Sequence, residues 1–577
     1  MKKLRWPITI VILALTAIGV LLLTRQSVLP PVIPEEVQPV TGGVYIEALV
    51  GKISRLNPLL DLYNPPDHDI DRLIYSSLLR FDDRGLPQGD LAESWGISLD
   101  GTVYNFSIRE EAVWHDGKPV TSQDIIFTVE MMRSEDSIFA VDVRELWNSV
   151  EVISLDEKTI QFRLPEPYAP FMDYLTFGIL PQHVWSGLSH AEMVDSSFNL
   201  QPVGSGPYYL ENLDVEESEI KGLVLRAFQG YYGQAPFIEQ IVFQYFPDSR
   251  SALEAYRRDE VMGISQITPD VLPEALREPN LRLYTGRLPE LSIIFINLDN
   301  PDVPFLAEAD IRQALFLGLN RQWMIDNLLD GQAILADGPV FPNTWAYYEG
   351  IEPVEYAPDE AVALLKQAGY TIPAEGGSVR TNEDGTALRL ELVYPDNDKH
   401  TSLAETIQAN WEKLGVEVNL VPAAYEDLVE AYLEPRLYQL ALIDLNLVRS
   451  PDPDPYPFWH QTQITGGQNY SKWDDFQVSE YLEQGRVIVD IGERTKNYRN
   501  FQVRFIQELP ALPLFYPVYV YGVDAEVQGV QMGPLFDASD RFSMVNNWYL
   551  VARRSEAAAD QTAADSTPEA SPPTAQP

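Results

Sequence analysis

Two aspartates stand within a proline-rich stretch, and their type and spacing raise the question of what chemistry they perform. The stretch is RSPDPDPYPFWH, residues 449–460, and it carries Asp452 and Asp454. Proline fixes its own backbone and biases the preceding residue toward extended conformations, so we expect a stiff, extended loop. In a polyproline II chain of three residues per turn, carboxylates two positions apart do not share a face. This disfavours a carboxylate pair for acid/base chemistry or metal binding, and leaves a solvated turn or a single-carboxylate ligand site.

The elements before this loop indicate where it lies. Alternating apolar residues over 388–394 predict a strand, and SLAETIQANWEKLG predicts a helix that is capped by Ser402 with Glu405 and closed by Gly415. VEVNLV, YEDLVEAYL and YQLALIDLNL then predict strand, helix and strand. This alternation is typical of a parallel α/β sheet, in which ligands bind beyond the carboxyl ends of the strands. Because the loop begins two residues after Leu447, at one such end, it is a candidate ligand site.

The first half of the chain mixes helices with hairpins. YNFSI, residues 104–108, alternates apolar and polar residues as a half-buried strand does, and Asp116-Gly117 predicts a turn. Thr121 with Asp124 resembles a capping box that starts a helix. The apolar face of that helix is Ile125, Val129 and Met132, and an earlier helix is predicted from Ile70, Leu73, Ile74 and Leu78.

Composition indicates a large globular protein and excludes several kinds of site. The chain has 577 residues, of which 45% are hydrophobic, which is enough for about four domain-sized units. Its 41 basic and 85 acidic residues give a formal net charge of −44, which repels phosphate backbones, so we expect no nucleic acid partner. Because there is no cysteine, disulfides, zinc-thiolate sites, thiol nucleophiles and lipidation on cysteine are excluded.

The N-terminus predicts a membrane anchor. Lys2, Lys3 and Arg5 precede an uncharged stretch, Trp6 to Thr24, of 19 residues, which nearly spans a hydrocarbon core of about 30 Å. A cleaved signal peptide is the alternative, but the stretch is longer than the usual apolar core and no A-x-A site follows it. We therefore predict that residues 1–25 form an uncleaved single-pass transmembrane helix in the cell membrane, with the body on the extracytoplasmic side.

Segments at both ends of the body carry no predicted site. Residues 26–41 contain four prolines and predict a semi-rigid linker between membrane and body. Residues 554–577 lack aromatic and large aliphatic side chains, so we expect a disordered acidic tail.

Longer motifs carry a family resemblance. Residues 91–132, LAESWGISLDGTVYNFSIREEAVWHDGKPVTSQDIIFTVEMM, resemble the signature region of solute-binding protein family 5, the dipeptide, oligopeptide and nickel receptors of ABC importers. PVGSGPYYL, IRQALFLGLNRQWMI, PDEAVALLKQAGY, SPDPDPYPFWH and GGQNYSKWDD follow in the family's order. The resemblance covers roughly residues 42–550. The chain departs from the family pattern in carrying Asn320 in place of aspartate, and in lacking a lipid-anchoring cysteine.

The resemblance implies a two-lobed α/β fold of the periplasmic-binding-protein type (type II), with a hinge. Lobe I would comprise residues 42–288 with an inserted subdomain at 67–199, lobe II residues 289–515, and residues 516–553 would return to lobe I. The hinge strands would be LPELSIIFINL and LPLFYPVYVYG, about which the lobes close on ligand.

The implied function is that of a monomeric extracytoplasmic receptor of an ABC importer. Such a receptor binds a small peptide between its lobes and delivers it to the permease subunits, and we expect no catalytic residue, metal or cofactor. In peptide-binding members an aspartate of the pocket loop pairs with the ligand's terminal ammonium, and Asp452 is the matching residue. Arg449 would contact ligand or form a salt bridge that holds Asp452.

Five further residues are candidates for the ligand site. His400 would meet a ligand carboxylate, or is a solvated loop histidine. Trp345, Trp459, Asn469 and Tyr470 would line the pocket or pack in the core, and the sequence leaves both alternatives open.

Other functions have less support. Family relatives also bind nickel complexes and sugars, so a non-peptide solute such as a nickel complex or oligosaccharide is one alternative. A surface sensor of the same fold would have only Met1 to Arg5 on the cytoplasmic side, too short for an output domain. An extracellular hydrolase is disfavoured because G-x-S-x-G, H-E-x-x-H and P-loop motifs are absent and the six histidines are scattered.

Overall fold

The structure is a computed structural model that describes residues 37–342, 344–446 and 451–554. The predicted anchor at 1–25, linker residues 26–36, Arg449 and tail residues 555–577 lie outside these ranges. Within them, no helix is long and apolar enough to cross a membrane.

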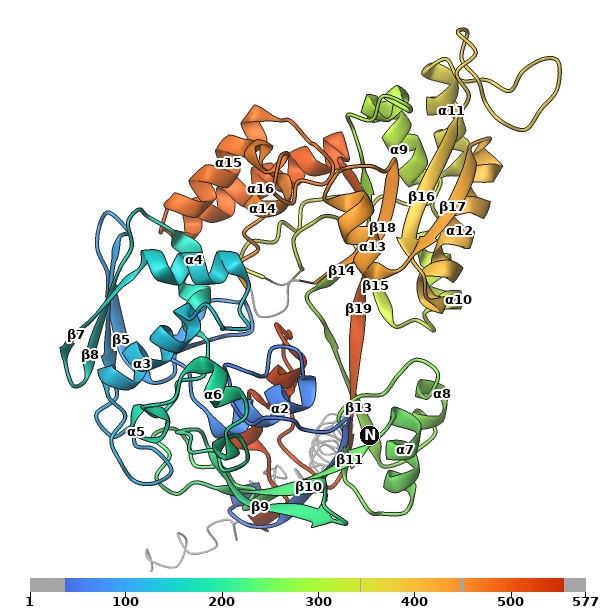
Figure 1. Cartoon of the computed structure of the whole chain (residues 1–577). Helices are drawn as coiled ribbons and strands as arrows, with labels where there is room; N and C mark the ends of the chain where they lie inside the picture. The colour runs from blue at the N-terminus through green and yellow to red at the C-terminus, as the bar shows by residue number, and fades with distance from the viewer. Residues whose placement is uncertain (1–36, 343, 447–450, 555–577) are drawn as a thin grey trace, which may run out of the picture. The chain divides into compact units, whose positions relative to one another are not determined.

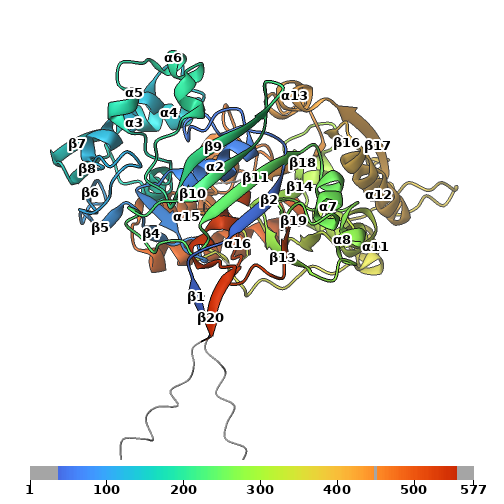
Figure 2. The same cartoon turned by 90° about the horizontal axis from the view of Figure 1, so that it is seen from below.

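The described chain divides into a body, residues 41–550, and a small separate unit. In the small unit, β1 (Val37–Val40) pairs antiparallel with β20 (Val551–Arg554) (Figure 2). Residues 37–40 were predicted to belong to the proline-rich linker, so for these four residues that prediction is wrong: their backbone is paired in a strand.

The body is organised by one sheet of 12 strands, whose main order is β17-β16-β18-β14-β19-β12-β2-β11-β10-β9. Its strands are β2 (Val44–Val50), β9 (Tyr208–Glu216), β10 (Glu219–Ala227), β11 (Gln240–Phe246), β12 (Gly263–Ile264), β13 (Leu281–Arg287), β14 (Glu290–Ile296), β15 (Ala333–Leu335), β16 (Arg389–Pro395), β17 (Glu417–Ala423), β18 (Leu440–Asn446) and β19 (Ala511–Asp524).

Strand β19 belongs to both halves of this sheet. It pairs antiparallel with β12 and β13 through its C-terminal part, and with β14 and β15 through its N-terminal part (Figure 1). We call the part of the body built around β2 and β9–β13 lobe I, and the part built around β14–β18 lobe II. The two predicted hinge strands are therefore β14 and β19, and β19 physically joins the lobes.

Lobe II confirms the predicted parallel sheet. Strands β16, β17 and β18 are parallel, with α12 (Asp398–Leu414) between β16 and β17. The predicted helix start is wrong, because the side chain of Asn397 caps the helix by accepting from the backbone N–H of His400 at 3.0 Å. Ser402 lies inside the helix and donates to the carbonyl of Asp398 at 2.9 Å. Gly415 ends the helix as predicted, in the left-handed conformation with φ 84°.

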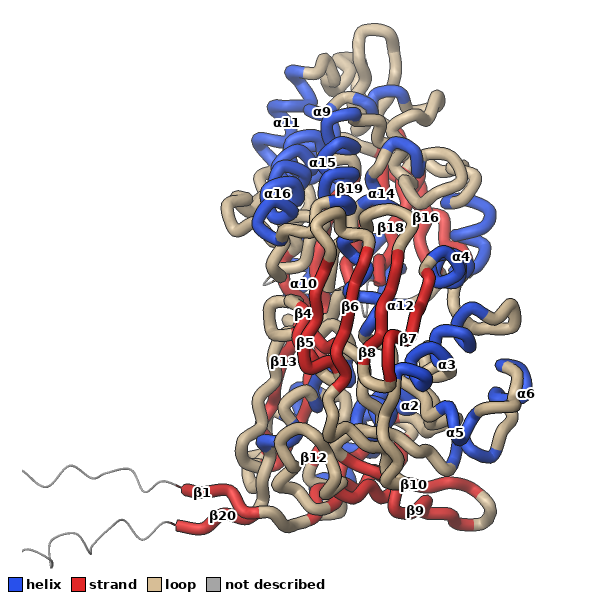
Figure 3. The backbone as a smooth tube through the Cα atoms, turned by 90° about the vertical axis from the view of Figure 1, so that its left-hand side faces the viewer, coloured by secondary structure: helices blue, strands red, loops and turns tan. Residues whose placement is uncertain are grey.

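The inserted part of lobe I carries its own four-stranded sheet, β5-β6-β8-β7 (Figure 3). Tyr104, Phe106 and Ile108 of β6 are buried, as the alternation predicts. The capping box also forms, since the carboxylate of Asp124 accepts from the backbone N–H of Thr121 at 2.8 Å. The strands outside the large sheet are β3 (Leu79–Phe81), β4 (Pro87–Gly89), β5 (Ala92–Ile97), β6 (Val103–Ile108), β7 (Glu151–Asp156) and β8 (Thr159–Arg163).

Helices cover both lobes. The α-helices not yet given are α2 (Pro65–Ile74), α3 (Ser122–Arg133), α4 (Val141–Ser149), α5 (Gln182–Trp185), α6 (His190–Val194), α7 (Ser249–Arg257), α8 (Leu272–Ala275), α9 (Ala309–Leu317), α10 (Arg321–Leu328), α11 (Pro358–Gln367), α13 (Tyr425–Asp427), α14 (Tyr456–Trp459), α15 (Phe476–Val487) and α16 (Ile491–Glu508). Short 3₁₀ or π turns are η1 (Ala169–Leu175), η2 (Ser197–Leu200), η3 (Pro304–Ala307), η4 (Leu428–Leu433), η5 (Gln461–Gln463), η6 (Ala538–Phe542) and η7 (Val545–Asn547).

Two sequence features at helix ends have clear local roles. The side chain of Asn320, the departure from the family pattern, caps α10 by accepting from the backbone N–H of Trp323 at 3.1 Å. Helix α2 ends at Ile74, so Leu78, which was predicted as part of this helix, is buried beyond its end, just before β3.

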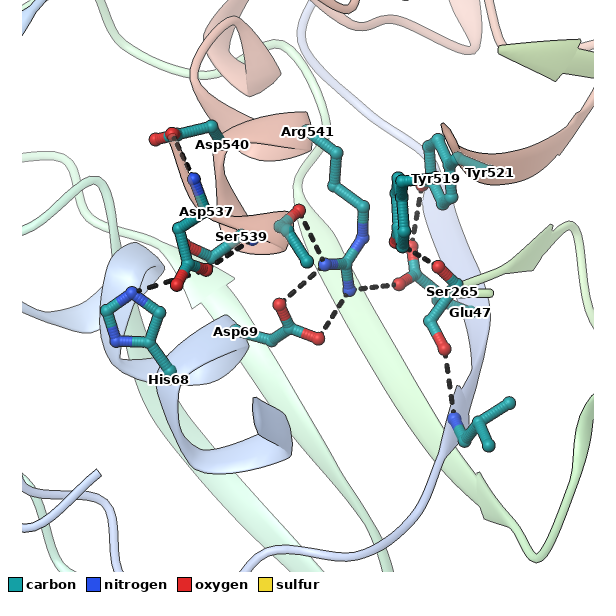
Figure 4. Close-up of polar contacts among 12 residues, drawn as sticks. Glu47, His68, Asp69, Ser265, Tyr519, Tyr521, Asp537, Ser539, Asp540 and Arg541 are labelled. Carbon is teal, nitrogen blue, oxygen red and sulfur yellow. Dashed lines mark hydrogen bonds and ion pairs between the residues drawn. The ribbon is translucent and has the colours of Figure 1, made fainter. Parts of the chain in front are cut away.

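A buried ion cluster fastens the C-terminal return segment to lobe I (Figure 4). Arg541 of η6 binds both carboxylate oxygens of Asp69 at 2.5 and 2.8 Å, and Glu47 of β2 at 2.9 Å. Tyr521 of β19 donates to the other oxygen of Glu47 at 2.7 Å. Burial raises the pKa of the Glu47 carboxyl, while Arg541 counteracts the rise. The guanidinium of Arg541 thus ties η6 to α2 and β2, and Glu47 extends the cluster to β19.

Candidate ligand site between the lobes

The proline loop does not remain extended. The backbone N–H of Asp454 donates to Oδ1 of Asp452 at 3.1 Å, and Asp454 has a φ of +21°. Helix α14 then begins at Tyr456. The prediction of a fully extended loop is therefore wrong for these residues, because an aspartate side chain that accepts a bond from the backbone two residues on favours a turn.

Asp452 is buried and already paired within the protein. Its side chain is 6% exposed, and Oδ2 lies 2.5 Å from Nη2 of Arg494 on α16. The hydroxyl of Tyr498 donates to Oδ1 at 3.3 Å. Burial raises the pKa of the Asp452 carboxyl, and the Arg494 guanidinium counteracts that rise. Arg494 is therefore the cation that pairs with Asp452, a role that the sequence suggested for a ligand ammonium or for Arg449.

Arg494 is itself held in place on several sides. Its Nε donates to the carbonyl of Gly485 at 2.7 Å, and its guanidinium lies 4.8 Å from the ring centroid of Trp345. Trp345 also packs against Tyr498, with ring centroids 5.5 Å apart. The predicted pocket residue Trp345 thus supports the Asp452–Arg494 pair.

Asp454 binds a second arginine. Arg486 of α15 reaches both of its carboxylate oxygens, with the shortest contact at 2.6 Å, and the Asp454 side chain is only 17% exposed. The guanidinium also stacks 3.9 Å from the ring centroid of Tyr456. Each aspartate of the loop thus has its own arginine, so the loop is not a solvated turn.

The loop also contacts lobe I. The backbone N–H of Asp452 donates to Oδ2 of Asp173 in η1 at 2.8 Å. The hydroxyl of Tyr168, just before η1, donates to Asp454 at 3.4 Å. Burial and the nearby Asp452 raise the pKa of the Asp173 carboxyl well above its usual range. The proline loop is therefore a bridge between the lobes as well as a candidate ligand site.

Three cavities adjoin this bridge. The first, which we call the proline cavity, has a volume of about 360 Å³ and lies against Pro451 and Pro453. The central cavity, about 860 Å³, lies between α2, the β3–β4 hairpin, Pro451 and the segment 530–544. The lobe I cavity, about 390 Å³, reaches Asp173. Volumes of this size are typical of small-ligand sites.

These cavities are neighbours. The proline and central cavities share Pro451, Met532, Gly533, Pro534 and Phe536 as lining residues. The central and lobe I cavities share His68, Arg72, Arg80, Thr176 and Ser543. The central cavity thus shares lining residues with each of the other two, and the proline loop borders the proline and central cavities.

Comparison with known proteins decides the family. Residues 87–467, about two thirds of the chain, match the profile of the bacterial extracellular solute-binding proteins, family 5 (middle). The chain is a family 5 solute-binding protein. The predicted resemblance is confirmed.

Individual relatives of this family 5 chain differ in what they bind. It is 26% identical over 466 residues to the dipeptide-binding protein of Escherichia coli K12, which covers 77% of this chain and 84% of that protein. The solved oligopeptide-binding protein AppA of Bacillus subtilis, in complex with a nonapeptide, matches with a TM-score of 0.64 and 22% identity, covering 89% of this chain and 100% of that one.

The solved NikZ of Campylobacter jejuni, in complex with Ni(L-His), matches with a TM-score of 0.65 and 24% identity, covering 88% and 99% of the two chains. The structural matches establish the two-lobed α/β fold predicted from the sequence. Among the described residues, no three His, Cys, Asp or Glu side chains cluster as a metal site would require.

His400 of this family 5 chain is engaged by lobe II itself. Its Nε2 lies 3.2 Å from Asp444 and its Nδ1 lies 2.9 Å from Oδ1 of Asn397. Asp444 also binds Lys399 at 2.8 Å and accepts from the hydroxyl of Ser292. These contacts lower the pKa of the Asp444 carboxyl despite its burial. His400 is a buried helix residue here, neither a solvated loop histidine nor a cavity-lining one.

The three remaining candidates pack within lobe II. Trp459 lies between Phe295 and Phe505, with ring centroids 5.6 and 4.8 Å away. Asn469 clamps its own loop by donating to the carbonyls of His460 and Trp473 at 3.1 and 2.9 Å. Tyr470 packs on Phe295 at 5.6 Å. Neither these three nor Asp452, Trp345 and His400 line the three cavities.

Sequence reasoning missed the residues that surround the loop. Arg494, Arg486 and Asp173 have no local pattern that distinguishes them from ordinary helix or turn residues, since their partners lie 32 or more positions away. Arg287, which lines the proline cavity, was likewise not singled out. Its position just before the predicted hinge strand LPELSIIFINL was the available signal.

Proposed function

We propose that this chain is the extracytoplasmic binding receptor of an ABC importer, that it binds peptides between its two lobes, and that it delivers them to the permease. The observation that carries the proposal is the series of cavities at the lobe junction, bordered by the proline loop. The names of the E. coli and B. subtilis relatives support peptides as the ligand class. A pocket enclosed between lobes suits a transport receptor because closure hides the ligand until the permease opens it.

Peptide backbone would be satisfied by main-chain groups of the receptor, in an extended, strand-like manner. Asp452 would accept the ligand's terminal ammonium once ligand opens a path to its buried carboxylate, which lines none of the three cavities as they stand. A carboxylate offers about four lone-pair sites, and three donors now reach Asp452: Arg494, Tyr498 and the N–H of Asp454. One site thus remains for a ligand donor, and the turn around Asp454 holds the carboxylate before the ligand arrives, which lowers the ordering cost of binding.

The ligand class is tested by mass spectrometry of whatever co-purifies with the chain. A defined population of short peptides is the expected result. A nickel complex or an oligosaccharide in place of peptides would refute the peptide assignment, and release of cleaved peptide during incubation would favour a hydrolase over a receptor.

The role of Asp452 is tested by calorimetric titration with a peptide and its N-acetylated analogue. Acetylation removes the ammonium charge, so we expect it to weaken binding to the wild type and to have little further effect in Asp452→Asn. If Asp452→Asn binds the free peptide as tightly as the wild type, the ammonium partner lies elsewhere.

The finer assignments from the sequence also belong to this proposal. We propose an uncleaved membrane anchor at residues 1–25, lobe boundaries at 42–288 and 289–515 with a return at 516–553, and a monomeric receptor. The 19-residue uncharged N-terminal stretch supports the anchor. N-terminal sequencing of the mature protein is expected to start at Met1 or Lys2, and a start near residue 26 or later would refute the anchor.

A further inference from the structure

Arg287 stands at the end of β13, where the chain leaves lobe I for the hinge strand β14. It pairs in register with Val518 of the shared strand β19. Its side chain lines the proline cavity, on which Pro451 and Pro453 of the proline loop also border. Arg287 therefore lies at the junction of the lobes, beside the loop that carries Asp452.

One nitrogen of the Arg287 guanidinium has no hydrogen-bond partner within the part of the chain that the structure describes. This nitrogen, Nη1, is buried. Buried polar groups in native proteins nearly always have a hydrogen-bond partner, and an arginine cannot lose its charge to avoid the need for one. Arg287 thus brings a guanidinium with an unpaired nitrogen to the wall of the cavity, where a bound anion would supply the missing partner once the side chain turns toward it.

The cavity offers no anion of its own to Arg287. Among the described residues that line it, Arg287 is the only charged one, and the walls are mainly Ile334, Phe341, Val518, Leu535, Phe536 and five prolines. Proline has no N–H to donate, so Arg287 is the strongest donor available to a bound group. The two carboxylates of the proline loop do not line the cavity, and Asp452 and Asp454 bind Arg494 and Arg486.

We propose that the proline cavity binds a carboxylate of the ligand through Arg287, with the apolar part next to that carboxylate held by the surrounding walls. The planar guanidinium fork matches a carboxylate in bidentate geometry, and the low-dielectric surroundings strengthen the pair. The residue that the sequence indicated for this task, His400, is bound to Asp444 instead. The inference rests on the proposed function only in taking the ligand to be a peptide. The carboxylate of a peptide is its C-terminus or an acidic side chain.

The first test uses a probe that is not a peptide. Calorimetric titration of the full chain with 3-phenylpropionate and with 3-phenylpropionamide compares a carboxylate with a neutral group of the same shape. We expect the acid to bind about 10- to 100-fold more tightly, the range for a hydrogen-bonded charged group, and Arg287→Gln to abolish the difference. Equal binding of acid and amide to the wild type, or binding of neither, would overturn the inference.

The matched control is Arg282→Gln. Arg282 lies on the same strand, and its replacement changes the net charge by the same amount. It is exposed, and because side chains alternate along a strand it points to the opposite face from Arg287. It is expected to leave the preference for the acid unchanged. Arg287→Lys, which keeps the charge but loses the fork, should retain part of it. If Arg282→Gln and Arg287→Gln reduce acid binding equally, the effect is general electrostatics and the site is refuted.

The second test identifies the source of the carboxylate. The chain is incubated with pooled tripeptides as free acids, as C-terminal amides, and as amides with an internal glutamate, and the retained peptides are counted by mass spectrometry. If free acids are retained in preference to plain amides and the preference requires Arg287, the bound carboxylate is the C-terminus. If the glutamate amides are retained, the bound carboxylate is an acidic side chain. If no peptide is retained while 3-phenylpropionate still requires Arg287, the carboxylate site stands and the peptide function fails. Arg287-independent retention of all three classes overturns the inference and leaves the peptide function intact.

Discussion

The backbone N–H of Asp452 donates to the carboxylate of Asp173 at 2.8 Å, although the two residues lie 279 positions apart in the chain. Asp173 belongs to lobe I and Asp452 to lobe II, so this bond joins the lobes. The groups around the Asp173 carboxyl are the carboxylates of Asp452 and Asp454 and the guanidinium of Arg494. Burial and the negative Asp452 together favour the protonated form of Asp173.

The contact between the lobes at Asp173 should therefore depend on pH. The pKa of Asp173 is raised well above 3.8 where it touches Asp452, and it returns toward its ordinary value when the lobes separate. Asp173 thus binds its proton more tightly when the lobes are in contact than when they are apart. The contact is fully stabilised below about pH 4, and it weakens as the pH rises through the raised pKa.

The measurement is Förster transfer between dyes on the lobes. The chain has no cysteine, so Leu99→Cys and Phe476→Cys, both at exposed positions, allow specific labelling. We expect the lobes to separate as the pH rises above about 4 and through the raised pKa of Asp173. Asp173→Asn cannot ionise and should make the transfer independent of pH. A pH response that persists in Asp173→Asn would assign the titration to another group.

Asp452→Asn should destabilise the chain even without ligand. The substitution leaves the Arg494 guanidinium buried without its carboxylate, which typically costs about 3–5 kcal/mol in unfolding free energy. Urea unfolding measures the loss. The double variant Asp452→Asn with Arg494→Met should lose less than the sum of the single variants, because the two residues act as a pair. A single variant within about 0.5 kcal/mol of the wild type would contradict the pairing.

Asp454→Asn should also lower stability, although less. Its bidentate pair with Arg486 is partly exposed, so we expect a loss of about 1–2 kcal/mol in the same urea experiment. Asp474→Asn is the matched control because Asp474 is exposed and follows the same loop region. Equal effects of the two substitutions would mean that the Arg486 pair contributes nothing measurable.

Arg541→Met tests the cluster that fastens the C-terminal segment to lobe I. Removing the guanidinium leaves the carboxylates of Glu47 and Asp69 buried together, so we expect a loss of about 3–5 kcal/mol. Arg258→Met, which breaks an exposed pair with Glu260, should cost less than about 1 kcal/mol. Thermal unfolding of both variants provides the comparison, and similar midpoints would refute the role of the cluster.

Ligand should close the lobes further about β14 and β19. Because these strands join the lobes, rotation about them narrows the junction around a bound peptide. Small-angle scattering should report a smaller radius of gyration for the chain saturated with co-purified peptide than for the ligand-free chain. An unchanged radius would argue against hinge closure.

The sequence by itself determined the local elements of this protein. Apolar alternation predicted β6 and β16–β18, and Gly415 predicted the end of α12, because strand faces and a left-handed helix end are each set by a few neighbouring residues. The long motifs between residues 91 and 475 were sufficient for the family, and the fold followed from it. The start of α12 was misplaced because two competing caps, Asn397 and Ser402, lie five residues apart.

Only the tertiary structure decided the electrostatics of the site. Whether Asp452 faces a ligand, Arg449 or Arg494 depends on how α16 packs against the loop, and no local pattern fixes the approach of residues more than 40 positions apart. The same holds for Arg287, whose free guanidinium nitrogen follows from the apolar residues and prolines that segments 334–342, 451–453 and 532–536 bring to one cavity. A sequence shows which residues are charged, but the fold decides which charges pair. The interaction between two charges depends on their distance in space, not on their separation along the chain.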